Sequence, residues 1–123
     1  MIMLCRSEER ANTAINSIND AVRDSNGTVT FEQCDMSSML SVRKCAERLL
    51  EYVNKIDILV NNDGGNNAWG REVTEDGFEL TLATNHLGHF LLTDLLAPLF
   101  KESVESGFTP RFTHDSLWHD SSD

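Results

Sequence analysis

A short turn of asparagine, aspartate and glycine follows an apolar segment near the middle of this 123-residue chain. The turn consists of Asn61, Asn62, Asp63 and Gly64, and residues 56–60 precede it. Asparagine and glycine suit bends in which a ligand can approach the main chain closely. A turn that binds nothing is the simpler alternative, because the same residue types form ordinary loops. The turn is therefore a candidate binding site for a small polar ligand.

A second candidate is Asn85, which lies in an apolar segment with helical spacing. An amide buried among apolar side chains needs hydrogen-bond partners, which are either backbone groups or a functional ligand. His86 and His89 are three residues apart and would share one side of a helix. A zinc site needs further ligands, and none is evident. We therefore interpret both histidines as ordinary helix residues and expect no metal.

Three strands and three helices in alternation are predicted to position these residues. The predicted strands are residues 1–5, 28–34 and 56–60, and the predicted helices start near Ser7, at Ser37 or Ser38, and at Thr74. The third helix should reach about residue 103, and Pro98 should kink or break it. Strands that alternate with helices predict an α/β fold with a parallel sheet.

The last part of the chain differs from the rest. Residues 107–123 are polar where this fold would continue with another apolar strand. We therefore predict a single partial domain over residues 1–106 and a disordered tail over residues 107–123.

Composition and charge exclude several classes of function. The chain is 40% hydrophobic, as in an ordinary globular protein, and its net charge is −10. Nucleic acids and anionic membranes attract clustered lysine and arginine, so no nucleic-acid partner is expected. Three widely spaced cysteines predict neither a disulfide framework nor a zinc site. No apolar run approaches the roughly 18 residues of a membrane span, which predicts a cytoplasmic location for the chain as written.

Two motifs give the sequence a resemblance to a known family, the short-chain dehydrogenases/reductases. Residues 59–64, Leu-Val-Asn-Asn-Asp-Gly, are similar to the family's Asn-Asn-Ala-Gly motif, with Asp63 in place of alanine. Residues 83–93, Ala-Thr-Asn-His-Leu-Gly-His-Phe-Leu-Leu-Thr, resemble a helix motif of the retinol dehydrogenase branch. The resemblance covers about residues 1–103 and implies a Rossmann-type, doubly wound parallel sheet.

The resemblance also implies roles for individual residues. Asn85 falls on the catalytic asparagine, which holds a water in a proton relay, and the turn at Asn61, Asn62 and Gly64 lies along the cofactor's adenosine ribose. The carboxylate of Asp63 would repel the cofactor's phosphates.

The ends of the first two predicted strands carry the implied nucleotide preference. Arg6 implies NADP(H) rather than NAD(H), because an arginine there pairs with the 2′-phosphate. Asp35 would accept a hydrogen bond from the adenine amino group, and Met36 would pack on the ring. Helix capping is the competing role for Asp35.

Other family motifs do not occur in these residues. The sequence contains no Gly-x-Gly-x-x-Gly turn and no Tyr-x-x-x-Lys pair. Its single tyrosine, Tyr52, precedes Lys55 by three residues and is interpreted as a surface residue. Ser116 could be aligned with the family's catalytic serine, but we do not predict a strand before it. We therefore expect a partial sheet that lacks the family's first strand and C-terminal half.

The functional prediction follows from this resemblance. The chain is expected to be a fragment of an NADP(H)-dependent oxidoreductase for a lipophilic alcohol or aldehyde, inactive by itself, with endoplasmic reticulum attachment in its full-length parent. Family dimers form through the long helix around Asn85, so a homodimer is expected. One alternative is a non-catalytic interaction or nucleotide-binding module derived from the fold. An unrelated flavodoxin-like domain is a weaker alternative, because it does not explain the motif spacing.

Overall fold

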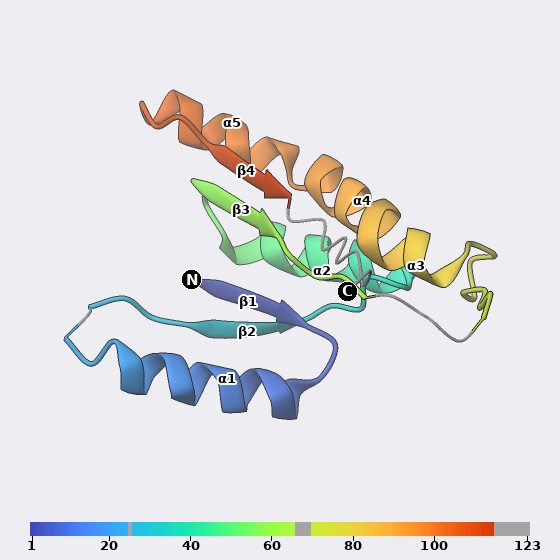
Figure 1. The fold of residues 1–123 in the computed structure, drawn as a ribbon. Coiled ribbons are helices and arrows are strands. Elements are labelled where there is room, and N and C mark those ends of the chain that lie inside the picture. Colours follow the sequence, from blue (N-terminus) through green and yellow to red (C-terminus); the bar gives the residue numbers. More distant parts are fainter. Residues whose placement is uncertain (25, 66–69, 115–123) are drawn as a thin grey trace, which may run out of the picture. The chain divides into compact units, whose positions relative to one another are not determined.

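A computed structural model describes residues 1–24, 26–65 and 70–114 of the chain. These residues form two compact units, Met1–Asp35 and Met36–Asp123. The elements of both units alternate between strands and helices, and the paired strands run parallel (Figure 1). The predicted α/β class with parallel strands is therefore confirmed. None of the helices in the described residues is long and apolar enough to cross a membrane.

The first unit is a strand–helix–strand segment. Strand β1 (Ile2–Cys5) pairs with β2 (Thr30–Gln33), and helix α1 (Glu8–Ala21) connects them. Ser7 caps α1 as predicted, because its hydroxyl accepts a hydrogen bond from the Arg10 backbone at 3.4 Å. The parallel pairing brings the carboxyl ends of both strands to the same edge.

Helix α2 (Met39–Tyr52) opens the second unit and is capped by Ser38, whose hydroxyl accepts from the Ser41 backbone at 3.3 Å. A carboxylate far along the chain completes this cap. Asp76 accepts from the Met39 backbone at 2.8 Å, across 37 residues. A negative charge at a helix N-terminus is favourable, because the backbone N–H groups there lack intrahelical partners. The loop around Asp76 is thereby fixed to the start of α2.

A fourth strand corrects the prediction for the end of the chain. Strand β4 (Arg111–His114) pairs parallel with β3 (Ile58–Asn61), so the described residues contain four strands rather than three. Arg111, Thr113 and His114 are polar, so the hydrophobic pattern of the sequence does not predict this strand. The pairing with β3, not the burial of side chains, defines it, because all four β4 residues are exposed. Ser116 and the rest of residues 115–123 lie outside the described residues.

The predicted long helix is a series of four shorter segments. These are α3 (Leu80–Leu82), a π-helical turn η1 (Ala83–Leu87), α4 (Gly88–Leu95) and α5 (Ala97–Glu105). The start near Thr74 was wrong, because Glu79 caps the series by accepting from the backbones of Thr81 and Leu82 at 2.9 and 2.8 Å. These two bonds hold the pKa of Glu79 below its usual range. The predicted break is confirmed at Leu96, just before Pro98 in the first turn of α5.

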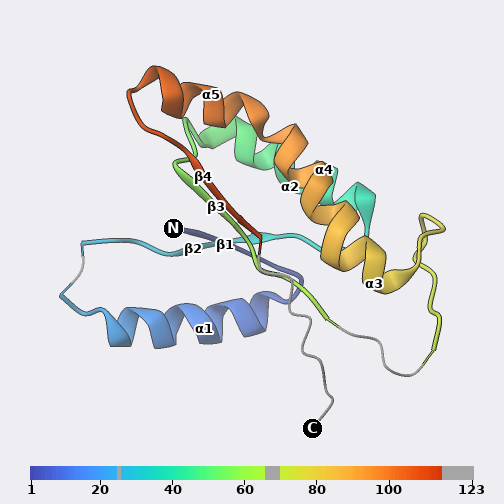
Figure 2. The same cartoon turned by 45° about the horizontal axis from the view of Figure 1, so that its top comes forward.

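The helices of the second unit share one side of its sheet. Figure 2 shows α2, α4 and α5 on the same side of β3 and β4. The core between them is built from apolar side chains of α2 and the α4–α5 region, namely Val42, Cys45, Ala46, Leu49, Leu92, Leu96, Leu99 and Phe100. Gly88 permits close packing here, because a Cβ at this position would lie 2.4 Å from the Met36 backbone oxygen.

A hydrogen-bonded anchor joins the end of α5 to the segment before β3. The buried hydroxyl of Ser103 lies 2.8 Å from both the Ile56 backbone oxygen and the Asp57 carboxylate. Lys55 approaches the same carboxylate at 3.0 Å. The Ser103 hydrogen bond, followed by the Lys55 hydrogen bond, lowers the pKa of Asp57.

Candidate functional site

The turn that follows β3 is held by two side chains of the adjoining helix. Asn85 and His89 are four residues apart and therefore lie on one helix face. Asn85 bonds the backbone of Gly65, and His89 bonds the backbone oxygen of Asp63 at 2.7 Å. The turn backbone is thus fixed at two points with one residue, Gly64, between them. The structure brings Asn85 together with the turn residues, a contact that the sequence did not predict.

Asn85 uses both ends of its side-chain amide on a single residue. Its Oδ1 accepts from the Gly65 N–H at 3.0 Å, and its Nδ2 donates to the Gly65 oxygen at 3.0 Å. Asn85 lies within the π-helical turn η1, a feature that is frequent at functional sites. An amide oxygen has two lone pairs and the nitrogen two hydrogens, so each atom retains capacity for one further partner. A backbone-positioning role is therefore present, and the catalytic role of Asn85 stays a prediction.

His89 was interpreted as an ordinary helix residue, and the structure gives it a defined place in the site. The ring is 3% exposed and lies against the turn. Its Nδ1 faces the Asn61 Oδ1 at 3.3 Å, and the Asn61 amide nitrogen donates to the Thr93 hydroxyl at 3.3 Å. His114, at the end of β4, contacts the His89 ring edge-on with 5.8 Å between centroids. The spacing of Asn85 and His89 was the available sequence signal, since i and i+4 share a helix face.

The other turn residues differ in exposure. The Asn61 side chain is buried, whereas Asn62, Asp63 and Gly64 are exposed. The Asp63 carboxylate is therefore accessible, while its backbone oxygen is bound by His89. The roles of all four residues in cofactor binding stay predictions.

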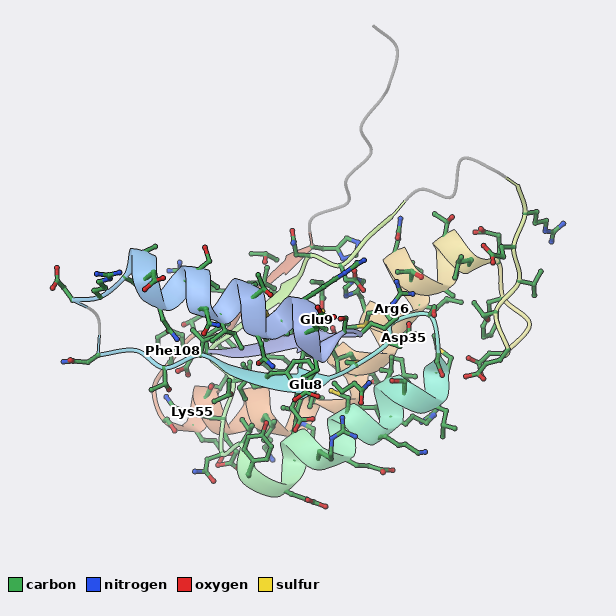
Figure 3. All side chains as sticks on the ribbon, turned by 90° about the horizontal axis from the view of Figure 1, so that it is seen from below. Arg6, Glu8, Glu9, Asp35, Lys55 and Phe108 are labelled. Carbon is green, nitrogen blue, oxygen red and sulfur yellow. The ribbon has the colours of Figure 1, made fainter. Side chains whose placement is uncertain are left out.

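Arg6 and Asp35 lie at the carboxyl edge of the first unit. Cys5 and Gln33 are register partners, so the residues that follow them leave the sheet at the same end (Figure 3). The Gln33 side chain donates to the Arg6 backbone oxygen at 3.5 Å, which connects the two segments. Arg6 is exposed and Asp35 is partly buried. This placement agrees with the expected nucleotide-binding edge, and the role of each residue stays a prediction.

Two acidic residues accompany Arg6. Glu8 and Glu9 occupy the first turn of α1, where they are exposed and stabilise the helix by interacting favourably with its dipole. Their charges oppose the attraction of an anionic ligand to Arg6.

Met36, expected to pack on adenine, is only 5% exposed and its backbone contacts the Gly88 position. Its buried side chain offers little surface to a ring in this arrangement.

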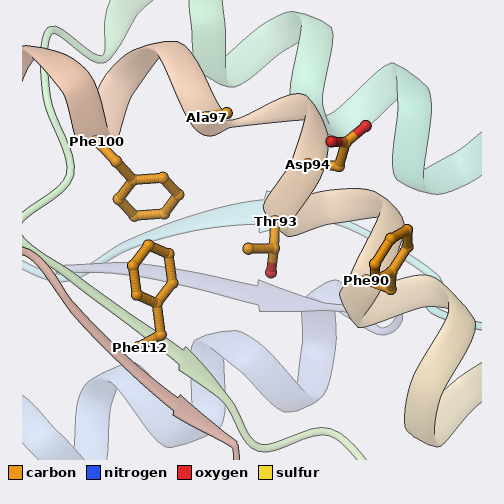
Figure 4. A pocket seen from close by; sticks show the side chains of 6 residues that line it. All are labelled: Phe90, Thr93, Asp94, Ala97, Phe100 and Phe112. Atoms are coloured by element: carbon orange, nitrogen blue, oxygen red, sulfur yellow. The ribbon is translucent and has the colours of Figure 1, made fainter.

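Two shallow hollows accompany these residues in the second unit. One, of about 340 Å³, lies between α4, α5 and β4, where the rings of Phe100 and Phe112 meet with centroids 4.4 Å apart (Figure 4). The other, of about 270 Å³, is lined by Asn61, Thr93, Phe90 and the three histidines His86, His89 and His114. No group of three or more metal-binding side chains was found within the part of the chain that the structure describes.

Known proteins resemble this chain in both sequence and fold. The family model described as short chain dehydrogenase matches residues 1–107. Retinol dehydrogenase 13 of Homo sapiens is 38% identical over 108 residues, which cover 86% of this chain and 31% of that protein. Retinol dehydrogenase 14 of Mus musculus is 36% identical over 114 residues, covering 86% and 34%. The chain thus spans about a third of the length of these relatives.

Solved structures give the same result for the fold. An uncharacterized protein from Mycobacterium paratuberculosis is 36% identical with a TM-score of 0.63, over 80% of this chain and 32% of that one. The RhlG/NADP active-site complex of Pseudomonas aeruginosa is 23% identical with a TM-score of 0.69, over 90% and 40%. The expected Rossmann-type class is thereby confirmed. The family match over residues 1–107, together with these relatives, shows that the chain belongs to the short-chain dehydrogenase family and is retinol dehydrogenase-like.

Proposed function

We propose that this chain carries nucleotide-recognition residues of an NADP(H)-dependent oxidoreductase that acts on a lipophilic alcohol or carbonyl compound. The observation that carries the proposal is the turn at residues 61–65, whose backbone is fixed by Asn85 and His89 of the helix motif at residues 83–93. A rigid, exposed turn can bind a ligand without the entropic cost of ordering it. The retinol dehydrogenase relatives support the lipophilic substrate class.

NADP(H) rather than NAD(H) is the proposed cofactor because of Arg6. This guanidinium is exposed at the carboxyl edge of β1 and β2, where a parallel sheet of this class receives its nucleotide. Arginine binds a phosphate through two N–H groups, a geometry that a ribose hydroxyl does not offer. Asp35 follows the neighbouring strand and can accept from an amino group. The RhlG neighbour is itself an NADP complex, which is consistent with this choice.

The chemistry assigned to this chain is binding and orientation, not the complete reaction. The cofactor supplies the hydride when bound, and the protein must then move a proton to or from the substrate oxygen. The sequence holds no Tyr-x-x-x-Lys pair for that step. Asn85 keeps one lone pair and one N–H beyond its bonds to Gly65, so it can hold a water or a polar group near the turn. We therefore propose that the 123 residues alone do not turn over substrate.

Fluorescence titration of the full chain with NADPH, with NADH as the competing nucleotide, tests the proposal. We expect NADPH to bind more tightly than NADH, and Arg6→Ala to remove this preference by weakening NADPH at least about fivefold. Arg43→Ala is the matched control, since Arg43 is an exposed arginine on α2. Equal affinities of the wild type for both nucleotides, or an equal effect of the two substitutions, would refute the assignment of Arg6.

Exposed apolar residues favour a second candidate function, an interaction module. Ile58 and Val60 are 56% and 60% exposed in the second unit, and Phe90 on α4 is 68% exposed. Contiguous exposed apolar patches commonly mark contact surfaces. The helix around Asn85 would form a homodimer through Phe90 in this candidate. Light scattering after size exclusion should report a dimer that Phe90→Asp converts to a monomer, and a wild-type monomer would rule the homodimer out.

A further inference from the structure

We infer that His89 is a positioning residue for nucleotide binding, which acts through the backbone carbonyl of Asp63. This inference rests on the proposed function and gives His89 a role without direct cofactor contact. The ring is 3% exposed, so its two nitrogens depend on protein partners rather than on water. Both nitrogens have such partners in the turn, 28 and 26 residues earlier in the chain.

The contact of Nε2 requires this nitrogen to be the hydrogen-bond donor. A backbone carbonyl oxygen accepts and cannot donate, so the 2.7 Å contact with Asp63 requires a hydrogen on Nε2. The geometry therefore fixes the nitrogen that carries the hydrogen. The short distance and the burial of the ring make this bond costly to lose, because the donor would be left without a partner.

The contact of Nδ1 is adaptable. Nδ1 faces the Asn61 side-chain amide, which can present either its oxygen or, after a half turn, its nitrogen. The Thr93 hydroxyl, on the other side of this amide, donates its hydrogen to the His89 backbone oxygen at 2.8 Å and accepts from the Asn61 amide nitrogen at 3.3 Å. The bond from Nε2 to the Asp63 oxygen is a separate contact that involves neither the Asn61 amide nor Thr93. The feature of His89 that fixes the turn is therefore the N–H group at Nε2, which donates to the Asp63 oxygen.

The bonds of His89 and Asn85 together fix the backbone on both sides of Gly64. His89 holds the Asp63 carbonyl, and Asn85 holds both backbone groups of Gly65. Gly64 between them is exposed, and a Cβ there would meet the Asn85 side chain only at 3.6 Å. The exposed backbone at Gly64 is therefore presented in one conformation. Without the His89 bond, one of the two fixed points is lost, and a ligand would have to order the turn itself.

Two isosteric substitutions separate the two ring contacts. His89→Gln places an amide nitrogen near the position of Nε2 and retains the donor for Asp63. His89→Asn places its nitrogen near Nδ1 and retains only the contact with Asn61. Both remove the ring and its edge contact with His114. A difference between them therefore reports the Asp63 bond rather than the loss of an aromatic side chain.

NADPH affinity of the full chain is the first measurement. We expect His89→Asn to weaken binding at least about tenfold and His89→Gln to stay within about threefold of the wild type. Equal losses in both variants, no loss in either, or a larger loss in His89→Gln would overturn the inference.

A nucleotide-free measurement keeps the inference separate from the proposed function. Nitrogen-15 spectra of the wild-type imidazole should show a hydrogen on Nε2 of His89, and an Nε2 without a hydrogen would overturn the inference. If the wild type binds no NADPH, the proposed function fails. The NMR chemical shifts of the Gly64 and Gly65 backbone amides then test the positioning role of His89, because they should change in His89→Asn and not in His89→Gln. The imidazole measurement also covers the case in which a variant does not fold.

Discussion

Asn85 and Gly65 are joined by two hydrogen bonds of 3.0 Å, so that one side-chain amide pairs with both backbone groups of one residue, as a neighbouring strand would. The pair spans 20 residues and connects a π-helical turn to the loop after β3. An asparagine is needed here because the contact requires both an acceptor and a donor in one side chain.

Substitution of Asn85 by aspartate should release Gly65. The carboxylate can still accept from the Gly65 N–H but faces the Gly65 oxygen with no hydrogen to donate. We expect faster hydrogen exchange at the Gly65 amide by at least about tenfold, because local opening becomes easier. Asn62→Asp is the control, since Asn62 is an exposed residue of the same turn. Unchanged exchange in Asn85→Asp would show that the pair does not hold the turn.

Gly88→Ala should destabilise the second unit. The added Cβ would lie 2.4 Å from the Met36 backbone oxygen, and a backbone atom cannot move aside as a flexible side chain can. We expect a loss of about 1–3 kcal/mol in the free energy of unfolding, as for other overpacked cores, measured by urea denaturation. Gly65→Ala provides the comparison, because a Cβ there meets nothing within 4 Å. A stable Gly88→Ala variant would contradict the close approach at Met36.

Acidification should weaken the anchor between Asp57 and Ser103. The Ser103 hydroxyl, followed by Lys55, holds the pKa of Asp57 below its ordinary value of 3.8. The unfolded chain therefore binds a proton more readily at this site. The stabilisation is fully present above pH 3.8 and is lost as the pH falls through the lower value in the folded state.

The comparison of wild type with Asp57→Asn isolates this effect. Urea unfolding at pH 6 and at pH 3 should show a larger loss of stability on acidification in the wild type than in Asp57→Asn. Glu47→Gln, which changes an exposed carboxylate on α2, should retain the wild-type dependence. Identical pH dependence in the wild type and Asp57→Asn would mean that the Ser103 contact does not stabilise the charged form.

Asp63→Ala should strengthen NADPH binding, if the proposed function is right. The Asp63 carboxylate is exposed on the turn, and a negative charge close to a bound phosphate is unfavourable. The bond to His89 uses the backbone oxygen, so the substitution leaves the turn held. We expect a gain of about three- to tenfold at low ionic strength that shrinks in added salt. Weaker binding by Asp63→Ala would instead assign the carboxylate a direct role in recognition.

Local sequence signals were sufficient for much of the fold. Apolar runs and serine caps located β1, α1 and α2, and Pro98 indicated the break before α5, because these features depend on residues a few positions apart. The resemblance of two motifs indicated the family and gave Asn85 and the turn residues 61–64 as separate candidate site residues. The fold inferences needed only residues within one segment, whereas the family inference needed the resemblance of both motifs to a known family.

Other features were decided by contacts between distant segments. Strand β4 is polar and exposed, and its pairing with β3 defines it. The cap that Asp76 supplies to α2 crosses 37 residues, and the bond from His89 to Asp63 crosses 26. Sequence periodicity reports which side of an element is apolar, but it does not report which backbone group a polar side chain meets. The sequence thus indicated the family through two motifs and gave the candidate turn, whereas the tertiary structure decided what holds that turn, because hydrogen-bond partners are fixed only when distant segments pack together.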